Sequence, residues 1–351
     1  MDYRQRHEEL MKLIEYHNDR YYNQDDPEIT DYEYDQLTLE IRQIEKEHPE
    51  LCECSPTQKV GGQAKRTSDI SVKHDVPMLS IQDVFTKDDV LKWTNEVRLK
   101  HPDALFCVEQ KIDGLSMSMR YTDGQISMAE TRGDGEIGEN VTLNALVIPD
   151  VVKNLCKKYP YLEVRGEVYM THEDFDRTNE RQELLGKKLF ANPRNCAAGT
   201  LRQLDPEITK ERGLSVFVFN VQTGPDELMV SHSDAMHILG ECEKMKMVPG
   251  KLCSSNEEII AEIDRISEIR GQLDYDIDGA VVKIDQITYR NDFPAGNKYS
   301  AGHIAYKYPP EEKETVLTNI ELTVGRTGRI NPTAVFNPVR LCGTTVCRAT
   351  L

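Results

Sequence analysis

The sequence predicts an α+β protein built as an N-terminal helical hairpin, a central domain with antiparallel sheets and the beginning of a small β-barrel. Three observations lead to this prediction. Apolar residues recur at helical spacing near the N-terminus, short apolar strands joined by tight turns alternate with helices in the middle, and only strand-like runs follow Pro310. We therefore expect a helical domain with its linker at 1–62, a sheet domain at 63–314 and a partial barrel at 315–351.

Two helices form the predicted hairpin. The first covers residues 2–22 and turns one face inward, made of Leu10, Leu13, Ile14, His17 and Tyr21. The second begins at the capping-box sequence TDYE at 30–33 and stops at Pro49, with the inward residues Tyr34, Leu37, Ile41 and Ile44. The hairpin tip collects tyrosines and carboxylates: Tyr21, Tyr22, Asp31, Tyr34 and Asp35. This tip is either a tyrosine-rich helix interface with solvated acids or a cup for a flat cation.

The central domain follows a linker at 55–62 and contains strands with interspersed helices. Helices are expected from the cap Thr86 to Lys100, from Thr171, and from the cap Ser255 with Ile259, Ile260, Ile263 and Ile266 inward. Strands are expected at 106–112, 162–170, 214–221, 278–284 and 305–308, and a hairpin joins 115–121 to 125–131 through Asp123 and Gly124. Beyond Pro310, strands are expected at 315–324 and 334–341, linked by residues 325–328.

One glycine-rich segment matches a nucleotide-binding pattern by sequence alone. The sequence GDGEIG at 133–138 has the glycine spacing of a dinucleotide-binding turn, but it follows a hairpin strand. Its acids Asp134 and Glu136 would repel a pyrophosphate. Because a lone match outside a βαβ unit is a weak signal, we do not assign a Rossmann site here.

Composition indicates a globular, enzyme-like chain of 351 residues with a net charge of −17. The N-terminus is too polar for a signal peptide, and no apolar run approaches the length of a membrane span. Nine scattered cysteines argue against a disulfide framework and for a reducing cytoplasm. No set of these cysteines has the spacing of a zinc site, so no structural metal is expected.

The charge is unevenly distributed along the chain. Residues 1–60 hold 16 acidic and 7 basic side chains, whereas residues 186–203 and 322–351 contain lysines or arginines but no acid. Two basic stretches on an acidic chain fit a phosphate-backbone partner at a restricted face. They also fit a simple balance against acidic neighbours, and charge alone leaves both interpretations open.

Charged residues repeatedly stand at the ends of apolar strands. Lys111 lies in KIDG at 111–114, after the apolar run LFCV, and is a potential nucleophile if its neighbours keep its amine neutral. The others of this kind are Asp113, Arg132, Glu167, Lys283 and Lys307. Each alone is an ordinary sheet-edge charge. Together they supply what attack on a nucleotide α-phosphate requires: a nucleophile, cations for the phosphate, and carboxylates for a ribose or metal.

In this order the motifs resemble the nucleotidyltransferase superfamily of DNA ligases, RNA ligases and capping enzymes. The tyrosine-rich hairpin, PMLSI at 77–81, TRGDG at 131–135 and FANPRN at 190–195 resemble the NAD-dependent bacterial DNA ligases over nearly the whole chain. The resemblance implies an NMN-binding domain at 1–62, an adenylation domain at 63–314 and the start of an OB-fold at 315–351. It also implies a cytoplasmic, monomeric enzyme of DNA replication and repair that consumes NAD, requires Mg²⁺ and acts on nicked double-stranded DNA.

The resemblance further implies roles for single residues. The catalytic set is Lys111, which becomes lysyl-AMP, with Asp113, Arg132, Lys283 and Lys307. The adenosine site takes Ser80, Ile81 and Glu109, the AMP moiety Arg132 and Glu167, and the α-phosphate Lys283 and Lys307. The NMN half takes Tyr21, Tyr22, Asp31, Tyr32, Glu33, Tyr34 and Asp35, and DNA takes Arg194, Arg202, Arg326 and Arg329. Like charges on Arg132, Lys283 and Lys307 are expected to lower the pKa of Lys111.

The sequence also departs from the family pattern. Gln110 and Cys196 replace the usual Leu and Ala, and SAGH at 300–303 replaces the usual PRWA, which removes an arginine and an aromatic. The family continues with the rest of the barrel, a zinc finger, helix-hairpin-helix repeats and a BRCT domain, so we expect adenylation by NAD with poor sealing of nicks. Two alternatives stay open: an ATP-dependent ligase-like nucleotidyltransferase, and a nucleotide- or DNA-binding fragment without turnover.

Overall fold

A computed structural model describes residues 3–20, 28–29, 31–54, 71–294, 296, 298–308, 313–324, 330–341 and 344–351. Several expectations fall outside these residues and are not addressed by it. They concern Tyr21, Tyr22, the cap at Thr30, the linker at 55–62, the turn at 325–328, Arg326 and Arg329. No helix among the described residues combines the length and the apolar character needed to cross a membrane.

The N-terminal hairpin consists of α1 (Tyr3–Asn18) and α2 (Asp31–Glu47), followed by the short helix η2 (Pro49–Cys54). Its small core is formed by Leu10, Ile14 and Ile41, as their helical spacing predicted. The inward placement of Leu13 is wrong, because its side chain is 39% exposed, whereas Leu10 and Ile14 are buried against α2. A buried hydrogen bond of 3.1 Å between His7 Nε2 and a carboxylate oxygen of Glu45 also joins the two helices.

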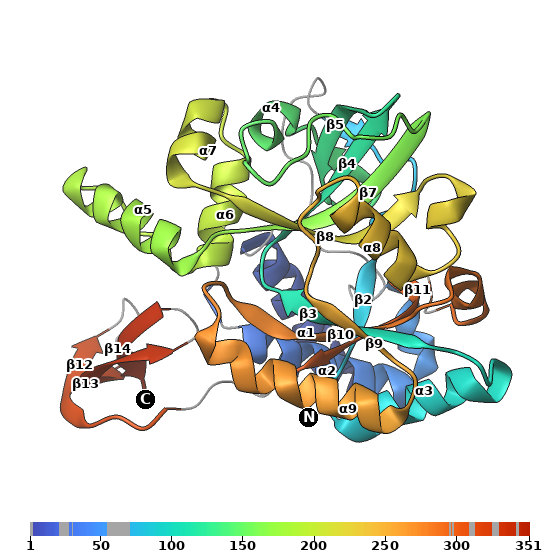
Figure 1. Ribbon diagram of the computed structural model, residues 1–351. Coiled ribbons are helices and arrows are strands. Elements are labelled where there is room, and N and C mark those ends of the chain that lie inside the picture. The colour runs from blue at the N-terminus through green and yellow to red at the C-terminus, as the bar shows by residue number, and fades with distance from the viewer. Residues whose placement is uncertain are drawn as a thin grey trace.

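A five-stranded sheet forms one half of the central region, in the order β2-β11-β10-β3-β9. Its strands are β2 (Ser80–Val84), β11 (Tyr299–Lys307), β10 (Ile277–Ile284), β3 (Phe106–Ile112) and β9 (Gly250–Cys253). All neighbours are antiparallel except β11 and β2. Helices α3 (Lys87–Lys100) and α9 (Asn256–Ile269) cover one face, and their apolar residues share one core with β3 and β10 (Figure 1). Both begin where the sequence predicted, at the side-chain caps Thr86 and Ser255.

A four-stranded antiparallel sheet forms the other half, in the order β5-β4-β7-β8. Its strands are β5 (Gln125–Thr131), β4 (Leu115–Thr122), β7 (Tyr161–Tyr169) and β8 (Ser215–Thr223). The predicted hairpin turn is confirmed, since Asp123 and Gly124 have φ of 50° and 77°, values that an Asp-Gly pair tolerates. The helices packed around this sheet are α4 (Thr142–Ala145), α5 (His172–Leu184), α6 (Pro193–Leu201), α7 (Pro206–Arg212) and α8 (His232–Glu241) (Figure 1). The expected α+β class is thereby confirmed.

The glycine pattern at 133–138 forms a turn between β5 and the short strand β6 (Ile137–Glu139), which pairs with β1 (Ser71–Lys73). A carboxylate oxygen of Asp134 accepts hydrogen bonds from the backbone N–H groups of Glu136 and Ile137. Gly133 has a φ of 57°, and a Cβ there would lie 1.8 Å from the Ile137 carbonyl oxygen. These glycines therefore serve a strand-to-strand turn, as the hairpin context indicated.

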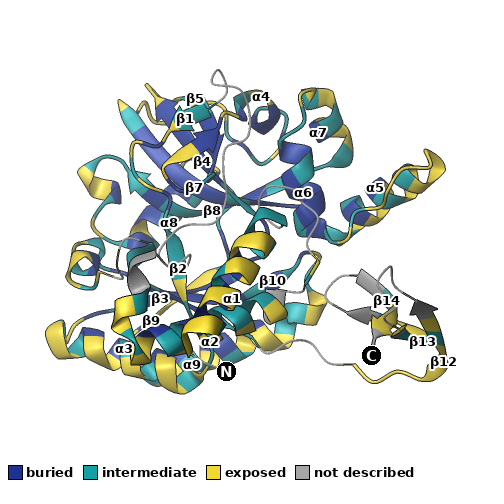
Figure 2. Ribbon diagram, turned by 180° about the vertical axis from the view of Figure 1, so that it is seen from behind, coloured by how far each residue is buried: buried dark blue, intermediate teal, exposed yellow. Residues whose placement is uncertain are grey.

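The last strands form a separate three-stranded sheet of β12 (Leu317–Val324), β13 (Ile330–Leu341) and β14 (Thr344–Thr350). The first two were predicted, and β14 was missed because its sequence contains few apolar residues. This sheet stands apart from the two large sheets (Figure 2). Several of its apolar side chains are exposed, although Ala334 is buried. Leu317, Ile320 and Leu322 are 53%, 47% and 68% exposed, as in a sheet whose apolar face lacks a covering layer.

Candidate active site

A cavity of about 790 Å³ is lined by residues of both large sheets and of the N-terminal hairpin. Most of the predicted site residues lie in its wall. These are Tyr34, Ser80, Ile81, Glu109, Lys111, Arg132, Glu167, Arg194, Arg202, Lys283 and Lys307. The folding of three distant parts of the chain around one space is what brings these residues together.

Lys111 lies near the end of β3, where β10 pairs with it through Gly279. Its Nζ donates a hydrogen bond of 2.8 Å to Asp278, the residue just before Gly279. Burial disfavours the ammonium form, but the carboxylates of Asp278 and Asp83 together outweigh burial and the repulsion of Lys307, so the pKa of Lys111 is raised. The expectation of a lowered pKa is therefore wrong for this arrangement, because it ignored the carboxylate on the neighbouring strand.

Lys307 at the end of β11 connects the hairpin to this lysine. Its Nζ lies 2.7 Å from a carboxylate oxygen of Asp35 on α2 and 4.0 Å from Asp278. Burial disfavours its charge, yet these carboxylates hold the pKa of Lys307 above its usual range. At the other end of β11, the Arg42 guanidinium of α2 donates to the Tyr299 hydroxyl and lies 5.6 Å from that ring's centroid. Two cation contacts thus join α2 to the two ends of β11.

A second group of charges lines the same end of the cavity. Arg194, at the start of α6, donates a hydrogen bond of 2.8 Å to Asp113, the acid of the KIDG sequence. Asn192 caps this helix and Pro193 begins it, which fixes where Arg194 points. Glu167 accepts a bond of 2.7 Å from Ser116, and burial raises its pKa against the opposing charges of Arg194, Lys111 and Arg132. Arg194, predicted as a DNA contact, lies in the cavity wall.

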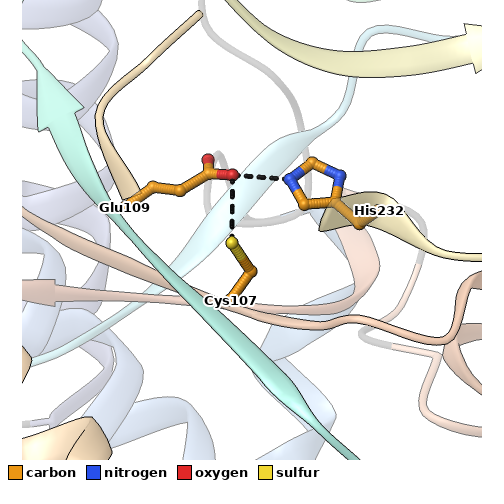
Figure 3. Close-up of side chains that lie close together, drawn as sticks. All are labelled: Cys107, Glu109 and His232. Carbon is orange, nitrogen blue, oxygen red and sulfur yellow. Dashed lines mark hydrogen bonds and ion pairs between the residues drawn. The ribbon is translucent and has the colours of Figure 1, made fainter. Parts of the chain in front are cut away.

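Glu109 organises the other end of the cavity and is almost fully buried. One carboxylate oxygen lies 2.6 Å from Nζ of Lys283, and the other lies 2.5 Å from Nε2 of His232 and 3.6 Å from the Cys107 sulfur (Figure 3). Burial disfavours its charge, but Lys283 and His232 outweigh burial and lower the pKa of Glu109 to about 2. Lys283 also donates to the Phe219 carbonyl oxygen at 2.6 Å. The structure therefore groups Lys283 with Glu109, four residues along β10 from the Gly279 that pairs with Lys111.

Two residues of the site were missed by sequence reasoning. Asp278 was treated only as a strand start, although its Asp-Gly sequence repeats the Asp113-Gly114 order at the matching strand end. His232 gave no signal, because it comes from α8 and reaches Glu109 only in three dimensions. Among the predicted NMN contacts, Tyr34 donates to Asn18 at 2.8 Å, Glu33 is exposed, and the side chains of Asp31 and Tyr32 lie outside the described residues.

Three family models match successive parts of the chain. The model of the NAD-dependent DNA ligase adenylation domain matches residues 67–311, more than half of the chain. The chain belongs to the NAD-dependent DNA ligase family. The DNA ligase-like N-terminal NAD⁺-binding domain matches residues 1–61, and the NAD-dependent DNA ligase OB-fold domain matches residues 314–351. The resemblance inferred from the motifs is thus confirmed.

Curated relatives support the same family. Proteins named DNA ligase from Clostridium kluyveri and Acetivibrio thermocellus are 48% and 45% identical over 353 and 354 residues, covering 100% of this chain. One from Clostridioides difficile is 43% identical over 349 residues, covering 98% of the chain. The chain spans about half the length of these relatives, namely 53%, 53% and 52% of each.

Proposed function

We propose that this chain transfers AMP from NAD to Lys111. The Lys111 amine attacks the α-phosphorus, a P–N bond forms, the bond to the bridging pyrophosphate oxygen breaks, and NMN leaves with that oxygen. The observation that supports this most is the continuous line of charges Asp35, Lys307, Asp278 and Lys111, which runs from the hairpin to the nucleophile. This line of charges supports a site for each half of NAD on either side of the phosphate that reacts.

The groups around Lys111 favour its protonated form. Asp278 accepts a hydrogen bond from Lys111, and the raised pKa shows that the ammonium form is favoured. Attack requires the neutral amine, so Lys111 must release a proton to solvent. Burial raises the pKa of Asp278, but Lys111 and Lys307 outweigh burial and lower it, so this carboxylate stabilises the ammonium form and is a poor base for it. We propose that Lys307 and Arg194 then balance the phosphate charge, which positions the reacting atoms without further covalent chemistry.

Mg²⁺ fits the carboxylates at this end of the cavity. Asp278 Oδ1 is buried and has no hydrogen-bond partner in the described part of the chain, so it has a lone pair available to a hard cation. We propose that Asp278, with Glu167 in the same wall, would hold Mg²⁺ together with phosphate oxygens and water. The ion would supply charge neutralisation at the transferring phosphate.

The two halves of NAD occupy different surroundings in this proposal. The adenosine half lies against Ser80, Ile81 and Glu109. Because Lys283 pairs with Glu109, we assign it to the adenine base rather than to the α-phosphate. The NMN half lies against the hairpin, where Tyr34 and Asp35 offer an aromatic face and a carboxylate to the cationic nicotinamide. NAD would be consumed as an AMP donor with no hydride transfer.

The later steps of the family's reaction are also proposals for this chain. AMP would pass from Lys111 to the 5′-phosphate of a nick in double-stranded DNA, and a phosphodiester bond would then form. Arg194 and Arg202 line the cavity from α6 and its end, and Arg326 and Arg329 lie outside the described residues. The exposed apolar face of the β12–β14 sheet is poorly suited to a stable DNA clamp, so we expect nick sealing to be much slower than adenylation.

Labelling with NAD that carries a radioactive adenylate tests this function. Label that stays with the protein through denaturation and depends on Mg²⁺ is expected. ATP labelled at the α-phosphate should not replace NAD, because nothing in ATP matches the hairpin site for nicotinamide. Label lost on denaturation would mean binding without turnover, and efficient labelling by ATP would favour the ATP-dependent alternative.

A further inference from the structure

Three nitrogen-bearing side chains, which we name the inner cationic cluster, line the cavity close to Lys283. They are Arg165 on β7, Arg290 on the short helix η6 (Ile287–Asp292) and His303 on β11, directly opposite Lys283 in the strand pairing. Arg165 and Arg290 are only 6% and 7% exposed. The nucleotide chemistry proposed above assigns no role to any of these three.

Each member has a buried nitrogen without a hydrogen-bond partner among the described residues: Arg165 Nε, Arg290 Nη2 and His303 Nε2. Neither arginine forms an ion pair with a carboxylate within the part of the chain that the structure describes. Leaving one buried donor unpaired costs about 1–3 kcal/mol. Three such donors in one cavity wall are too costly to retain unless something binds there.

The guanidinium groups are held in place by their other contacts. Arg165 donates to the carbonyl oxygens of Val76 and Pro77 at 2.9 and 3.0 Å. Arg290 donates through Nε to the Ile284 carbonyl oxygen at 2.8 Å. Its aliphatic stem packs against Gly302, where a Cβ would lie 2.6 Å from the Arg290 Cγ. The glycine of the SAGH sequence therefore makes room for this arginine, and the histidine that follows completes the cluster.

The two arginines supply the positive charge of the cluster. Burial, followed by Arg290, Lys283, His232 and Arg165, lowers the pKa of His303 well below its usual range, so this imidazole is neutral and contributes a ring nitrogen rather than a charge. Burial likewise lowers the pKa of each arginine to about 10. Carboxylates also act on the arginines, Glu163 and Glu130 on Arg165, and Glu109 and Asp285 on Arg290. Each of these carboxylates already accepts hydrogen bonds from other groups, so the three nitrogens keep their unmet hydrogen-bonding capacity. One water molecule could accept one of these bonds but has too few acceptor sites for all three.

A metal ion is the competing occupant of this region. The ligand atoms of Cys107, Glu109 and His232 lie within 4.8 Å of one another, which would suit a cation by spacing (Figure 3). Burial and Glu109 raise the pKa of the Cys107 thiol, so it is protonated at neutral pH, and Lys283 already occupies Glu109. The surrounding arginines would repel a divalent ion further.

We propose that the inner cationic cluster binds a small oxyanion of the orthophosphate class at the end of the cavity beyond Glu109. Such an anion carries several acceptor oxygens and enough charge to satisfy all three nitrogens at once. This inference goes beyond the proposed transfer of AMP and does not depend on it, because the anion would bind without NAD.

Thermal unfolding in phosphate, compared with chloride at equal ionic strength and without NAD, tests this proposal. The melting temperature of the unaltered chain should rise by about 2–4 °C at saturating phosphate. Arg290→Gln should lose that shift, Arg290→Lys should keep part of it, and Arg348→Gln, which alters an exposed arginine on β14, should keep it all. General salting-out by phosphate raises every variant equally, so equal shifts in all four proteins would overturn the proposal.

A second measurement covers the case in which Arg290→Gln does not fold. The ³¹P resonance of inorganic phosphate should broaden with the unaltered chain and with Arg348→Gln, and much less with His303→Ala. Equal broadening by all three proteins, or none, would also overturn the proposal. Repeating the thermal unfolding with AMP and phosphate together distinguishes two sources of the oxyanion. If the stabilisation by AMP adds to that by phosphate, the cluster binds a free anion. If AMP abolishes the effect of phosphate, the cluster binds the phosphoryl group of a nucleotide.

Discussion

The two ends of the cavity differ in how their charges are paired and how far they are exposed. Around Lys111, the carboxylates Asp278 and Asp35 hold lysines that remain partly exposed, so the pairs can be exchanged for phosphate oxygens. Around Glu109, one buried carboxylate serves Lys283 and His232 while further cations stand nearby. The difference indicates that the first end is built to change partners during a reaction, and the second is built to keep a fixed shape.

Removing the nucleophile should have the largest effect on the reactive end. Lys111→Ala should abolish covalent AMP, and Lys111→Arg should do so as well, since a guanidinium stays protonated and cannot attack. Intact-mass measurement after incubation with NAD and Mg²⁺ checks this, and circular dichroism should show an unchanged fold. An alanine variant that still gains the mass of one AMP would contradict the assignment.

Loss of the hairpin carboxylate should have the next largest effect. Asp35→Ala removes the partner of Lys307 and a carboxylate proposed to face nicotinamide, so single-turnover adenylation by NAD should fall by about 10²-fold. Glu47→Ala, which changes an exposed acid at the end of the same helix, is the matched control and should react normally. Equal rates for both variants would show that the hairpin contact seen here does not serve the reaction.

The raised pKa of Lys111 predicts a pH dependence that Asp278 controls. Because only the neutral amine attacks, the adenylation rate of the unaltered chain should increase with pH above neutrality. Asp278→Asn removes the main group that raises this pKa, so the rising limb should move to lower pH even though the maximum rate falls. Rate profiles that differ only in height would assign Asp278 a role in metal or substrate binding alone.

Changes to the buried groups around Glu109 should alter the stability of the fold more than the rate of adenylation. Burial and Lys283 lower the pKa of His232 to about 4, whereas an unfolded histidine titrates near 6.5. Between these pH values the His232 imidazole binds a proton in the unfolded chain but not in the folded chain. The free energy of unfolding should therefore fall as pH drops from about 6.5 to 4. His232→Gln should reduce this slope by up to about 1.4 kcal/mol per pH unit in denaturant titrations. His303 contributes a slope of the same sign, so the variant should retain part of it.

Below that range the acid sensitivity should come from Glu109. Its pKa of about 2 lies below the unfolded value near 4.3, so its stabilising contribution is complete above pH 4.3 and is lost as pH falls towards 2. Glu109→Ala would leave the buried Lys283 charge without its carboxylate and should cost about 3–5 kcal/mol at pH 7. A cost under 1 kcal/mol would contradict the view that this end is a fixed structural centre.

The sequence predicted much of the secondary structure because local signals were strong there. The caps at Thr86, Thr171 and Ser255 and the Asp123-Gly124 turn appear where they were expected, since each depends on a few adjacent residues. Strand β14 was missed because its side chains carry little apolar periodicity. The inward position of Leu13 was wrong because helical spacing alone does not say how wide the buried face is.

The site was predictable in composition but not in pairing. Family motifs predicted that Lys111, Glu109 and Lys283 share one pocket. They did not predict that Lys283 pairs with Glu109 or that Asp278 pairs with Lys111. Those pairings depend on the antiparallel register of β3 and β10, which sets which charges face each other across two strands. The direction of a pKa shift follows from such neighbours, and so it could not be read from the order of residues along the chain.

The most direct test of the account is to locate the adenylate after reaction with NAD. The chain is incubated with NAD and Mg²⁺, denatured, cleaved with a protease and mapped by mass spectrometry, with Lys111→Ala and Lys307→Ala treated in parallel. The account predicts one AMP on the peptide that contains Lys111, none in the Lys111→Ala chain, and a reduced amount at the same lysine in the Lys307→Ala chain. AMP found on any other residue, or no covalent AMP at all, would contradict it.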